Sequence, residues 1–392
     1  MSIAQQIVDR HSHHLIGNYG KLPAVFTRGN GSTLWDADGK SYIDLFAGFG
    51  GTVLGHAHPD LIKAIYLQSQ MLWHVGNQFY TEPQVRLAEA IRAASFEGRA
   101  FFCHSGAEAA EAAIKLARIS GGPDRKQIVS MLKGFHGRTL GALSATAGPA
   151  QQGFEPLVPD FVQVPFDDLS ALEEVMSERT AAVIMEPIQS EGGMNVPSPQ
   201  YIAGVRSLCD QTGAALIFDE VWTGVGRTGK FFGHQHVGVT PDIMTMGKAL
   251  GGGLPVGGIW AVPERASFFK PGTHGCTLGG NPICAAVSAE VFSVINRDNL
   301  LARAADGGKQ IVHFLQSSRN ASKIADIRGR GLFIGVQLGV PDATPLLHRC
   351  LEMGLVVNVT QKNVLRICPA LTITEGQLQQ GLELLDKALD KM

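Results

Sequence analysis

The chain has 392 residues, of which 45% are hydrophobic and 17% charged, and its mean hydropathy is +0.08. The formal net charge of −2 provides no basic surface for nucleic acid or an anionic membrane, so we expect small-molecule partners. No apolar run reaches the roughly 18 residues of a membrane helix, and the amino terminus lacks the apolar core of a signal peptide. Six cysteines without zinc spacing predict a cytoplasmic protein with reduced thiols and no metal.

The order of predicted elements indicates an α/β protein with a second, smaller domain. Residues 33–45 form two alternating runs around Asp38-Gly39, which is a hairpin signal. Strand-like and helix-like segments then alternate, which predicts a mainly parallel sheet flanked by helices. After a further helix, the last part becomes strand-rich and ends in another helix. We therefore expect an N-terminal segment that joins the small domain (1–59), a large domain (60–294) and a C-terminal small α+β domain (295–392).

The glycines at 224, 226 and 229 match the dinucleotide fingerprint G-x-G-x-x-G, and Lys230 extends them toward a triphosphate loop. A dinucleotide site needs a helix directly after the glycines, because the helix amino terminus binds the pyrophosphate. The segment KFFGHQHVGVTPD that follows has no helical period. A triphosphate loop needs Ser or Thr after the lysine, and Phe231 stands there. The sequence therefore predicts no nucleotide site here.

A better anion site is predicted at residues 105–108. The strand-like run RAFFCH leads into Ser105 and a strong helical pattern, and Ser105 with Glu108 forms a capping box. Gly106 lets a ligand approach the unpaired N–H groups at the helix start, where the dipole favours an anion. A simple capped helix would give the same pattern.

Six segments together resemble one family. They are SGAEAAEAAIKLAR, FHGRT, EPIQSEGG, DEVWTGVGRTG, PDIMTMGKALGGGLP and HGCTLGGNP, in that order. In order and spacing, they resemble class III (fold type I) pyridoxal-phosphate aminotransferases, from about residue 18 to residue 366. The resemblance implies a fold type I transferase, with a large domain that binds pyridoxal 5'-phosphate and a smaller α+β domain.

The resemblance also implies cofactor-binding and catalytic roles. Lys248 would bind the cofactor aldehyde covalently and later transfer the substrate proton. Asp219 would pair with the pyridine nitrogen and keep it protonated. Gly106 and Ala107 would donate backbone N–H groups to the phosphate.

Three further cofactor contacts are implied. Phe135 would stack on one face of the cofactor ring and Val221 would pack on the other. Thr277 would contact the phosphate in the neighbouring subunit, so a homodimer with shared active sites is expected. Buried apolar packing would explain Phe135 and Val221 equally well.

Two arginines and one glutamate are implied to bind the substrates, an amino donor and 2-oxoglutarate. Arg366 would bind the α-carboxylate of glutamate through a bidentate fork. Glu191 would neutralise Arg366 while an ω-amine is bound, and then move away. Arg138 would bind the other carboxylate. Read alone, each of the three would more simply be one half of a surface ion pair.

Within the family, the segment from residue 18 to residue 59 and the run HVGNQFYTEPQ most resemble the acetylornithine aminotransferases of arginine biosynthesis. The resemblance implies transfer of the δ-amine of N2-acetyl-L-ornithine to 2-oxoglutarate, which gives N-acetyl-L-glutamate 5-semialdehyde and glutamate. Phe49 favours an N-acylated donor, because it lacks the tyrosine hydroxyl with which ornithine aminotransferases hold the free α-amino acid group.

Three residues depart from the family pattern and leave other donors open. Trp222 replaces a usual Gln, Ser190 replaces a usual Gly, and Thr52 replaces an Asn. Ornithine, 4-aminobutyrate and succinylornithine remain alternative donors. A pyridoxal-phosphate decarboxylase or aminomutase would use the same fold, although neither needs Glu191 and Arg366 together.

Overall fold

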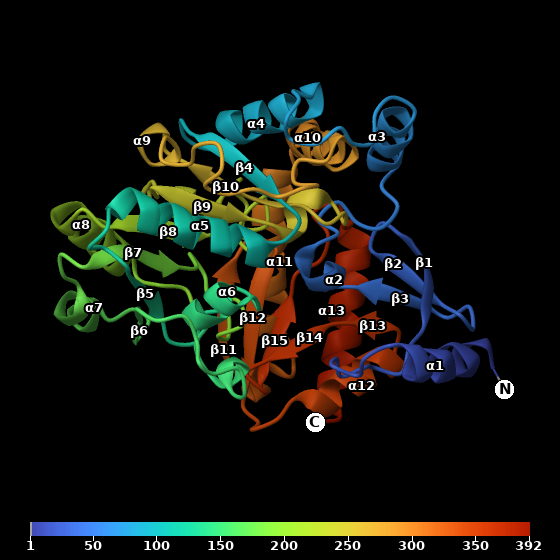
Figure 1. Ribbon diagram of the computed structural model, residues 1–392. Coiled ribbons are helices and arrows are strands. Elements are labelled where there is room, and N and C mark those ends of the chain that lie inside the picture. Colours follow the sequence, from blue (N-terminus) through green and yellow to red (C-terminus); the bar gives the residue numbers. More distant parts are fainter. Residues whose placement is uncertain (1) are drawn as a thin grey trace.

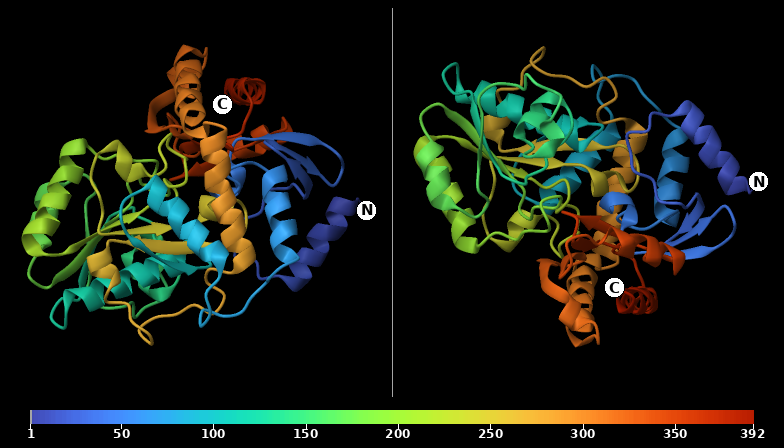
Figure 2. Two further views of the ribbon diagram at one scale, coloured as in Figure 1. Left: turned by 90° about the horizontal axis from the view of Figure 1, so that it is seen from above. Right: turned by 90° about the horizontal axis from the view of Figure 1, so that it is seen from below.

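The computed structural model describes residues 2–392, which form three β-sheets with helices packed around the largest one (Figure 1). In Figure 1 the C-terminal elements, red and orange, lie beside the blue N-terminal strands and below the central sheet. Figure 2 shows the N-terminal helix at the edge of the molecule in both views. Within the described residues, no helix combines the length and the apolar composition needed to cross a bilayer.

The central sheet has seven strands, and its interior strands are buried along their length except at Gln127. In spatial order the strands are β4 (Arg99–Cys103), β10 (Gly257–Ala261), β9 (Ile243–Met246), β8 (Ala215–Asp219), β7 (Thr180–Met185), β5 (Gln127–Met131) and β6 (Phe161–Val164). Only β10 is antiparallel to its neighbours, so the predicted mainly parallel sheet is confirmed. A parallel sheet covered on both faces explains why runs such as AAVIM and ALIF are apolar throughout.

Helices of the central part precede, connect and follow these strands. They are α3 (Pro59–Ser69), α4 (Glu82–Ala94), α5 (Gly106–Gly121), α6 (Leu140–Ala145), α7 (Leu169–Val175), α8 (Pro199–Thr212), α9 (Pro263–Ala266) and α10 (Pro282–Arg297), with 3-10 turns η1 (Pro149–Gln151), η2 (Gly233–His236) and η3 (Lys248–Gly251). An alanine-rich face of α5 packs against the sheet, and its small side chains allow close approach. No α-helix follows the glycines at 224–229, where only η2 forms, as the sequence predicts.

One of the two smaller sheets combines strands from both ends of the chain, and the other contains C-terminal strands alone. The N-terminal elements are α1 (Ile3–His14), β1 (Phe26–Asn30), β2 (Thr33–Asp36), β3 (Ser41–Asp44) and α2 (Ala47–Gly50). The C-terminal elements are α11 (Leu300–Ser317), η4 (Ala321–Lys323), β11 (Ile324–Arg330), β12 (Phe333–Leu338), α12 (Thr344–Glu352), β13 (Leu355–Val356), β14 (Asn358–Thr360), β15 (Val364–Ile367) and α13 (Glu375–Asp390). The predicted hairpin is β2–β3, and β13 extends its sheet in parallel with β3.

The pairing of β3 with β13 supports the division that the sequence suggests. We propose that residues 1–59 belong with the small domain 295–392, and that residues 60–294 form the large domain. One buried apolar cluster continues from the N-terminal strands through α10 to the C-terminal helices, so the proposed domains share a core.

Candidate active site

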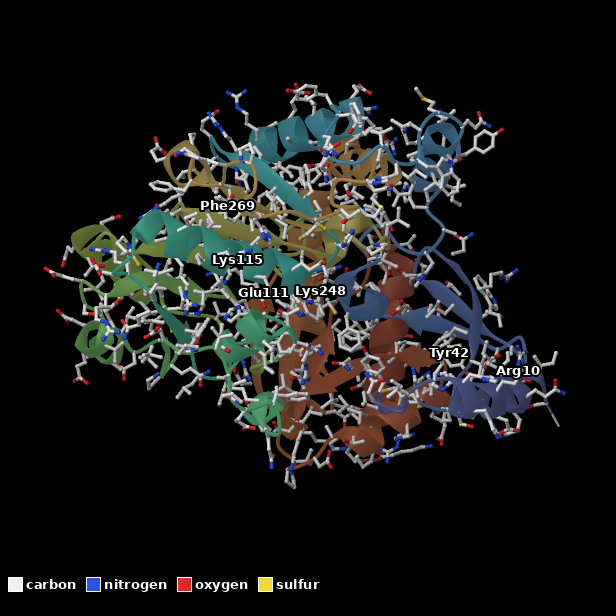
Figure 3. All side chains as sticks on the ribbon, in the orientation of Figure 1. Arg10, Tyr42, Glu111, Lys115, Lys248 and Phe269 are labelled. Atoms are coloured by element: carbon white, nitrogen blue, oxygen red, sulfur yellow. The ribbon has the colours of Figure 1, made fainter. Side chains whose placement is uncertain are left out.

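A cavity of about 270 Å³ opens where β8, β9, the start of α5 and the loop after β5 meet. Its lining includes seven of the predicted residues, which lie far apart in the sequence: Gly106, Ala107, Phe135, Arg138, Asp219, Val221 and Lys248. In Figure 3 the labelled Lys248 lies near the centre of the molecule, close to the junction of the central sheet and the C-terminal elements. The cavity therefore combines an amine, a carboxylate and a helix amino terminus.

Lys248 sits at the start of η3, immediately beyond β9, in a strained backbone conformation. Its φ is +41°, in the left-handed region that side-chain-bearing residues rarely adopt. The preceding Gly247 lies against the start of α5, because a Cβ added to it would lie only 3.1 Å from the backbone nitrogen of Gly106. The turn thus brings Lys248 to the cavity that Gly106 also lines.

Burial lowers the pKa of the Lys248 ammonium from 10.5 to about 8, and the negative charge of Asp219 opposes this shift. A neutral amine is a nucleophile and a proton acceptor, whereas an ammonium ion is neither. The site therefore makes the reactive form of Lys248 available near neutral pH.

Asp219 ends β8 and is buried, with both carboxylate oxygens hydrogen bonded. Oδ2 lies 2.7 Å from Nδ1 of His136, while Oδ1 accepts from the Thr245 hydroxyl at 3.0 Å and from the Val221 N–H at 3.1 Å. The carboxylate raises the pKa of His136 against the opposing effect of burial. These contacts fix the orientation of Asp219.

The sequence prediction missed His136 and Thr245 as partners of Asp219. His136 lies within the FHGRT segment, so the segment was recognised but its histidine received no role. Thr245 faces Asp219 because the two residues are register partners in the parallel pairing of β8 with β9. Strand pairing of this kind has no local sequence signal.

The start of α5 is shaped as a close-fitting anion site. The Ser105 hydroxyl accepts from the N–H of Glu108 at 3.2 Å, as predicted for the helix cap. The return contact differs from the prediction, because Glu108 Oε2 accepts the N–H of His104 at 2.8 Å, one residue earlier than a capping box requires. Gly106 has no room for a side chain, since an added Cβ would lie 2.9 Å from Val221.

Arg366 is fully buried on β15 beside this cavity and is held by two partners. Its Nη1 donates to Glu191 Oε1 at 2.6 Å, and its Nε and Nη2 donate to Asn358 Oδ1 at 2.9 and 2.5 Å. The structure therefore brings Glu191 and Arg366 together, as the sequence predicts. Asn358 was missed, because it meets Arg366 only through the pairing of β14 with β15.

The backbone of Glu191 is held by hydrogen bonds that do not involve its side chain. Its carbonyl oxygen accepts from the Thr360 hydroxyl at 2.7 Å and from the Gln361 amide at 2.8 Å. Its side chain is 30% exposed, and Arg366 is its ion-pair partner. The carboxylate can therefore leave the arginine without disturbing the backbone.

Aromatic rings surround the Arg366 guanidinium. Its Cζ lies 5.0 Å from the ring centre of Trp222 and 5.7 Å from those of Phe46 and Phe49. Trp222 also lies 4.5 Å from Lys248 Nζ and stacks on Phe333 at 5.3 Å. Trp222 therefore packs between the two cations of the site, and its indole N–H is buried without a hydrogen-bond partner among the described residues.

The other two departures from the family pattern have different surroundings. Ser190 donates to Glu186 Oε2 through its hydroxyl at 2.8 Å and through its N–H at 2.9 Å. Burial raises the pKa of Glu186, a carboxylate in the cavity wall, to about 7. Ser190 thus supplies a hydrogen bond that glycine cannot make.

Thr52 has a buried hydroxyl without a hydrogen-bond partner among the described residues, and nothing in the structure explains why Thr replaces Asn here.

The remaining predicted residues lie at the cavity edge or outside it. Phe135 lines the cavity, and the exposed guanidinium of Arg138 lies 5.6 Å from its ring centre. Within residues 2–392, Arg138 has no carboxylate partner. Thr277 is exposed in the loop before α10 and is not among the described residues that line the cavity of its own chain.

Comparison with known proteins agrees with this geometry. The family model described as "Aminotransferase class-III" matches residues 16–389. The acetylornithine aminotransferase of Caldanaerobacter subterraneus subsp. tengcongensis is 41% identical, over 97% of this chain and 98% of that protein. An acetylornithine/succinyldiaminopimelate aminotransferase of Yersinia pestis is 43% identical, over 94% and 93%. The solved ornithine aminotransferase of Toxoplasma gondii superposes with a TM-score of 0.95 at 30% identity, covering all of this chain and 95% of that one.

The chain therefore belongs to the class III aminotransferases, and the predicted fold type and cofactor are confirmed. The residues of the cavity fit pyridoxal phosphate. The free N–H groups of α5 suit its phosphate, Asp219 suits its ring nitrogen, and Lys248 suits its aldehyde.

The lowered pKa of Lys248 predicts how the apoenzyme captures its cofactor. Below pH 8 the neutral fraction of the amine falls about tenfold per pH unit, so the rate of covalent capture should fall with it. Above pH 8 the rate should level off. Stopped-flow mixing of apoenzyme with pyridoxal phosphate across pH 6–10, followed by visible absorption, measures this profile. A rate that keeps rising to pH 10 would contradict the lowered pKa, and Lys248→Arg provides the unreactive control.

Trp222 is predicted to stabilise the site through the packing of its buried ring. Trp222→Ala should lower the free energy of unfolding by about 3–5 kcal/mol, the usual cost of removing a buried aromatic ring. Phe154→Ala is the control, because Phe154 is an aromatic residue that is 58% exposed and should cost about 0.5 kcal/mol or less. Urea unfolding of both variants makes the comparison, and equal losses would contradict the packing role.

Proposed function

We propose that this chain transfers the δ-amino group of N2-acetyl-L-ornithine to 2-oxoglutarate, giving N-acetyl-L-glutamate 5-semialdehyde and glutamate. The observation that carries the proposal is the ion pair of buried Arg366 with the partly exposed Glu191 near Lys248. Such a pair suits an enzyme that must bind two unlike substrates in one pocket. The names of the relatives from Caldanaerobacter and Yersinia support the acetylated donor and its place in arginine biosynthesis.

The pair supports a simple exchange between the two substrates. While Glu191 neutralises Arg366, the part of the pocket beside Arg366 presents aromatic rings and an already paired cation, which suits the amine-bearing end of an ω-amine donor, because that end carries no carboxylate. When glutamate or 2-oxoglutarate enters, its α-carboxylate would replace Glu191 on the guanidinium. Asn358 would keep Arg366 in place during the exchange, because it holds the Nε and Nη2 atoms. A carboxylate that replaces a carboxylate leaves no buried charge unpaired.

The proposed catalytic roles belong to Lys248 and Asp219. Pyridoxal phosphate supplies an aldehyde that condenses with amines and a ring that accepts an electron pair. Lys248 would move the proton between the substrate carbon and the cofactor, for which a pKa near 8 is suitable. Asp219, held by His136 and Thr245, would keep a proton on the ring nitrogen.

The other site residues would position the cofactor and the second carboxylate. Gly106 and Ala107 would donate N–H groups to the phosphate, and Phe135 and Val221 would enclose the ring. The exposed, unpaired Arg138 at the cavity edge would bind the distal carboxylate of glutamate.

We also propose a cytoplasmic homodimer in which Thr277 contacts the partner's phosphate. An exposed apolar segment supports a second copy, since Met71, Trp73, Phe79 and Tyr80 are each at least 65% exposed. This segment lies beside the loop of Thr277, because Asn77 donates to the carbonyl oxygens of Cys276 and Gly279. Burial of these side chains against a second chain would remove apolar area from water.

Ornithine is the second candidate donor, favoured by the likeness to the Toxoplasma enzyme. Phe49, which is 51% exposed at the pocket near Arg366, argues against it. A free α-amino group would find no hydroxyl there to hold it, and the missing hydrogen bond is worth about 0.5–1.5 kcal/mol.

A panel of half-reactions tests the donor. The holoenzyme is mixed separately with N2-acetylornithine, ornithine, 4-aminobutyrate, succinylornithine and glutamate, and the change in cofactor absorption is followed. We expect acetylornithine to react faster than ornithine by about threefold to tenfold, the factor that corresponds to one hydrogen bond. A faster reaction with ornithine would overturn the assignment while leaving the enzyme an ω-aminotransferase.

The Glu191–Arg366 pair makes a second prediction. Arg366→Ala should slow the glutamate half-reaction by about 100-fold or more, since a hydrogen-bonded charge pair to a carboxylate is lost, while the acetylornithine half-reaction changes by less than tenfold. Arg179→Ala is the control, because Arg179 is 74% exposed and pairs only with Asp160 among the described residues. Equal losses in the two half-reactions would refute the exchange.

A further inference from the structure

A cluster of three metal-binding side chains lies outside the cavity. His104, Glu108 and Cys276 each offer one ligand atom, and these atoms all lie within 4.8 Å of one another. His104 ends the turn before α5, Glu108 is in its first turn, and Cys276 lies in the loop before α10. The proposed mechanism uses none of these side chains, and the sequence analysis predicted no metal.

The spacing of the atoms fits a small tetrahedral ion. His104 Nδ1 lies 3.2 Å from Glu108 Oε1 and 3.5 Å from Cys276 Sγ. Around tetrahedral zinc, bonds of about 2.0–2.3 Å place neighbouring ligand atoms about 3.3–3.8 Å apart. Two of the three separations are therefore already close to those of a zinc site, and a small rotation of the Cys276 side chain can adjust the third.

Each side chain keeps a free ligand atom despite its other contacts. Glu108 uses Oε2 for the N–H of His104 and for the Ser105 hydroxyl, which leaves Oε1 for an ion. Within the described residues, the nitrogen atoms of the His104 ring are the only side-chain neighbours within bonding distance of the Cys276 thiol. A histidine–carboxylate hydrogen bond explains the contact of His104 with Glu108, but it gives no reason for a thiol beside the same ring.

The ligand side chains are partly exposed in the single chain, and the loop of Cys276 is held in place. His104 and Glu108 are 37% and 40% exposed, and Cys276 borders a cavity of about 590 Å³. Asn77 donates to the backbone of Cys276 and Gly279, which fixes the loop that carries the thiol. The ligands are therefore already largely positioned for an ion.

We propose that His104, Glu108 and Cys276 form a zinc-binding site, with water as the fourth ligand. One nitrogen, one oxygen and one sulfur ligand suit Zn²⁺, whereas Mg²⁺ and Ca²⁺ prefer oxygen atoms alone. On binding, a Zn–S bond forms and the thiol proton passes to solvent. The ion would tie the turn that presents Gly106 to the loop that carries Thr277, the two segments proposed to bind cofactor phosphate.

The sequence could not indicate this site by spacing. His104 and Glu108 are four residues apart, but Cys276 lies 172 residues beyond His104. Only the contact between the β4–α5 turn and the loop before α10 brings the thiol to the histidine. The site depends on neither the donor nor the Glu191–Arg366 exchange, so its test is independent of the proposed function.

Zinc titration of the holoenzyme tests the proposal. Isothermal calorimetry with zinc chloride should show one more zinc ion per chain in the wild type than in Cys276→Ser. Cys284→Ser is the matched control, because Cys284 is also partly buried but lies outside the cluster. The histidines of α1, at positions 11, 13 and 14, stay in every variant, so any zinc they bind cancels in the comparison.

Two further measurements complete the test. His104→Asn should weaken the same site at least tenfold, and it replaces Cys276→Ser if that variant does not fold. Cobalt(II) in place of zinc should give the intense red-region bands of a tetrahedral site in the wild type and in Cys284→Ser. Equal zinc stoichiometry in the wild type and both cluster variants, or the absence of these bands, would overturn the proposal.

Discussion

The parallel pairing of β8 with β9 is the constraint on which the site depends. It places Asp219 opposite Thr245 at the ends of neighbouring strands, and the turn three residues beyond Thr245 places Lys248. Both strands are buried along their length, so a shift of register would expose apolar side chains and move the carboxylate away from the amine. The strained backbone at Lys248 persists because the surrounding core holds it. Packing of the sheet thus fixes the relative position of acid and amine.

Electrostatics in the site follows from that burial. Lys248 loses hydration, which favours its neutral form, while nearby carboxylates restore part of the charge. Arg366 is buried as well, but it is charged at all relevant pH values and must always have an acceptor. Asn358 satisfies two of its nitrogen atoms, and Glu191 serves the third with an anion that the substrate can replace. Loss of hydration therefore lowers the pKa of Lys248, whereas Arg366 keeps its charge and can exchange its anionic partner.

Trp222 links these two centres. Its ring lies against Lys248, Arg366 and Phe333, and Gly50 is needed beside it because an added Cβ would lie 2.9 Å from the ring. A glutamine at this position would supply a polar amide, whereas the tryptophan supplies apolar area and a quadrupole that attracts cations. The departure of Trp222 from the family pattern thus changes the wall between the two cations, while the hydrogen bonds of Asp219 involve other residues.

The sequence by itself determined the fold class and the family, and it predicted seven residues that the structure brings to one cavity, because a lysine, a strand-end aspartate and a glycine at a helix start each stand in a recognisable local segment. It also argued against a nucleotide at the glycines of 224–229, since no α-helix directly follows them. Only the tertiary structure decided which side chains support the site. His136, Thr245 and Asn358 reach their partners through strand pairing or loop packing, and Cys276 meets His104 across 172 residues. Such contacts carry no local signal, because they depend on the register and packing of segments that are distant in the chain.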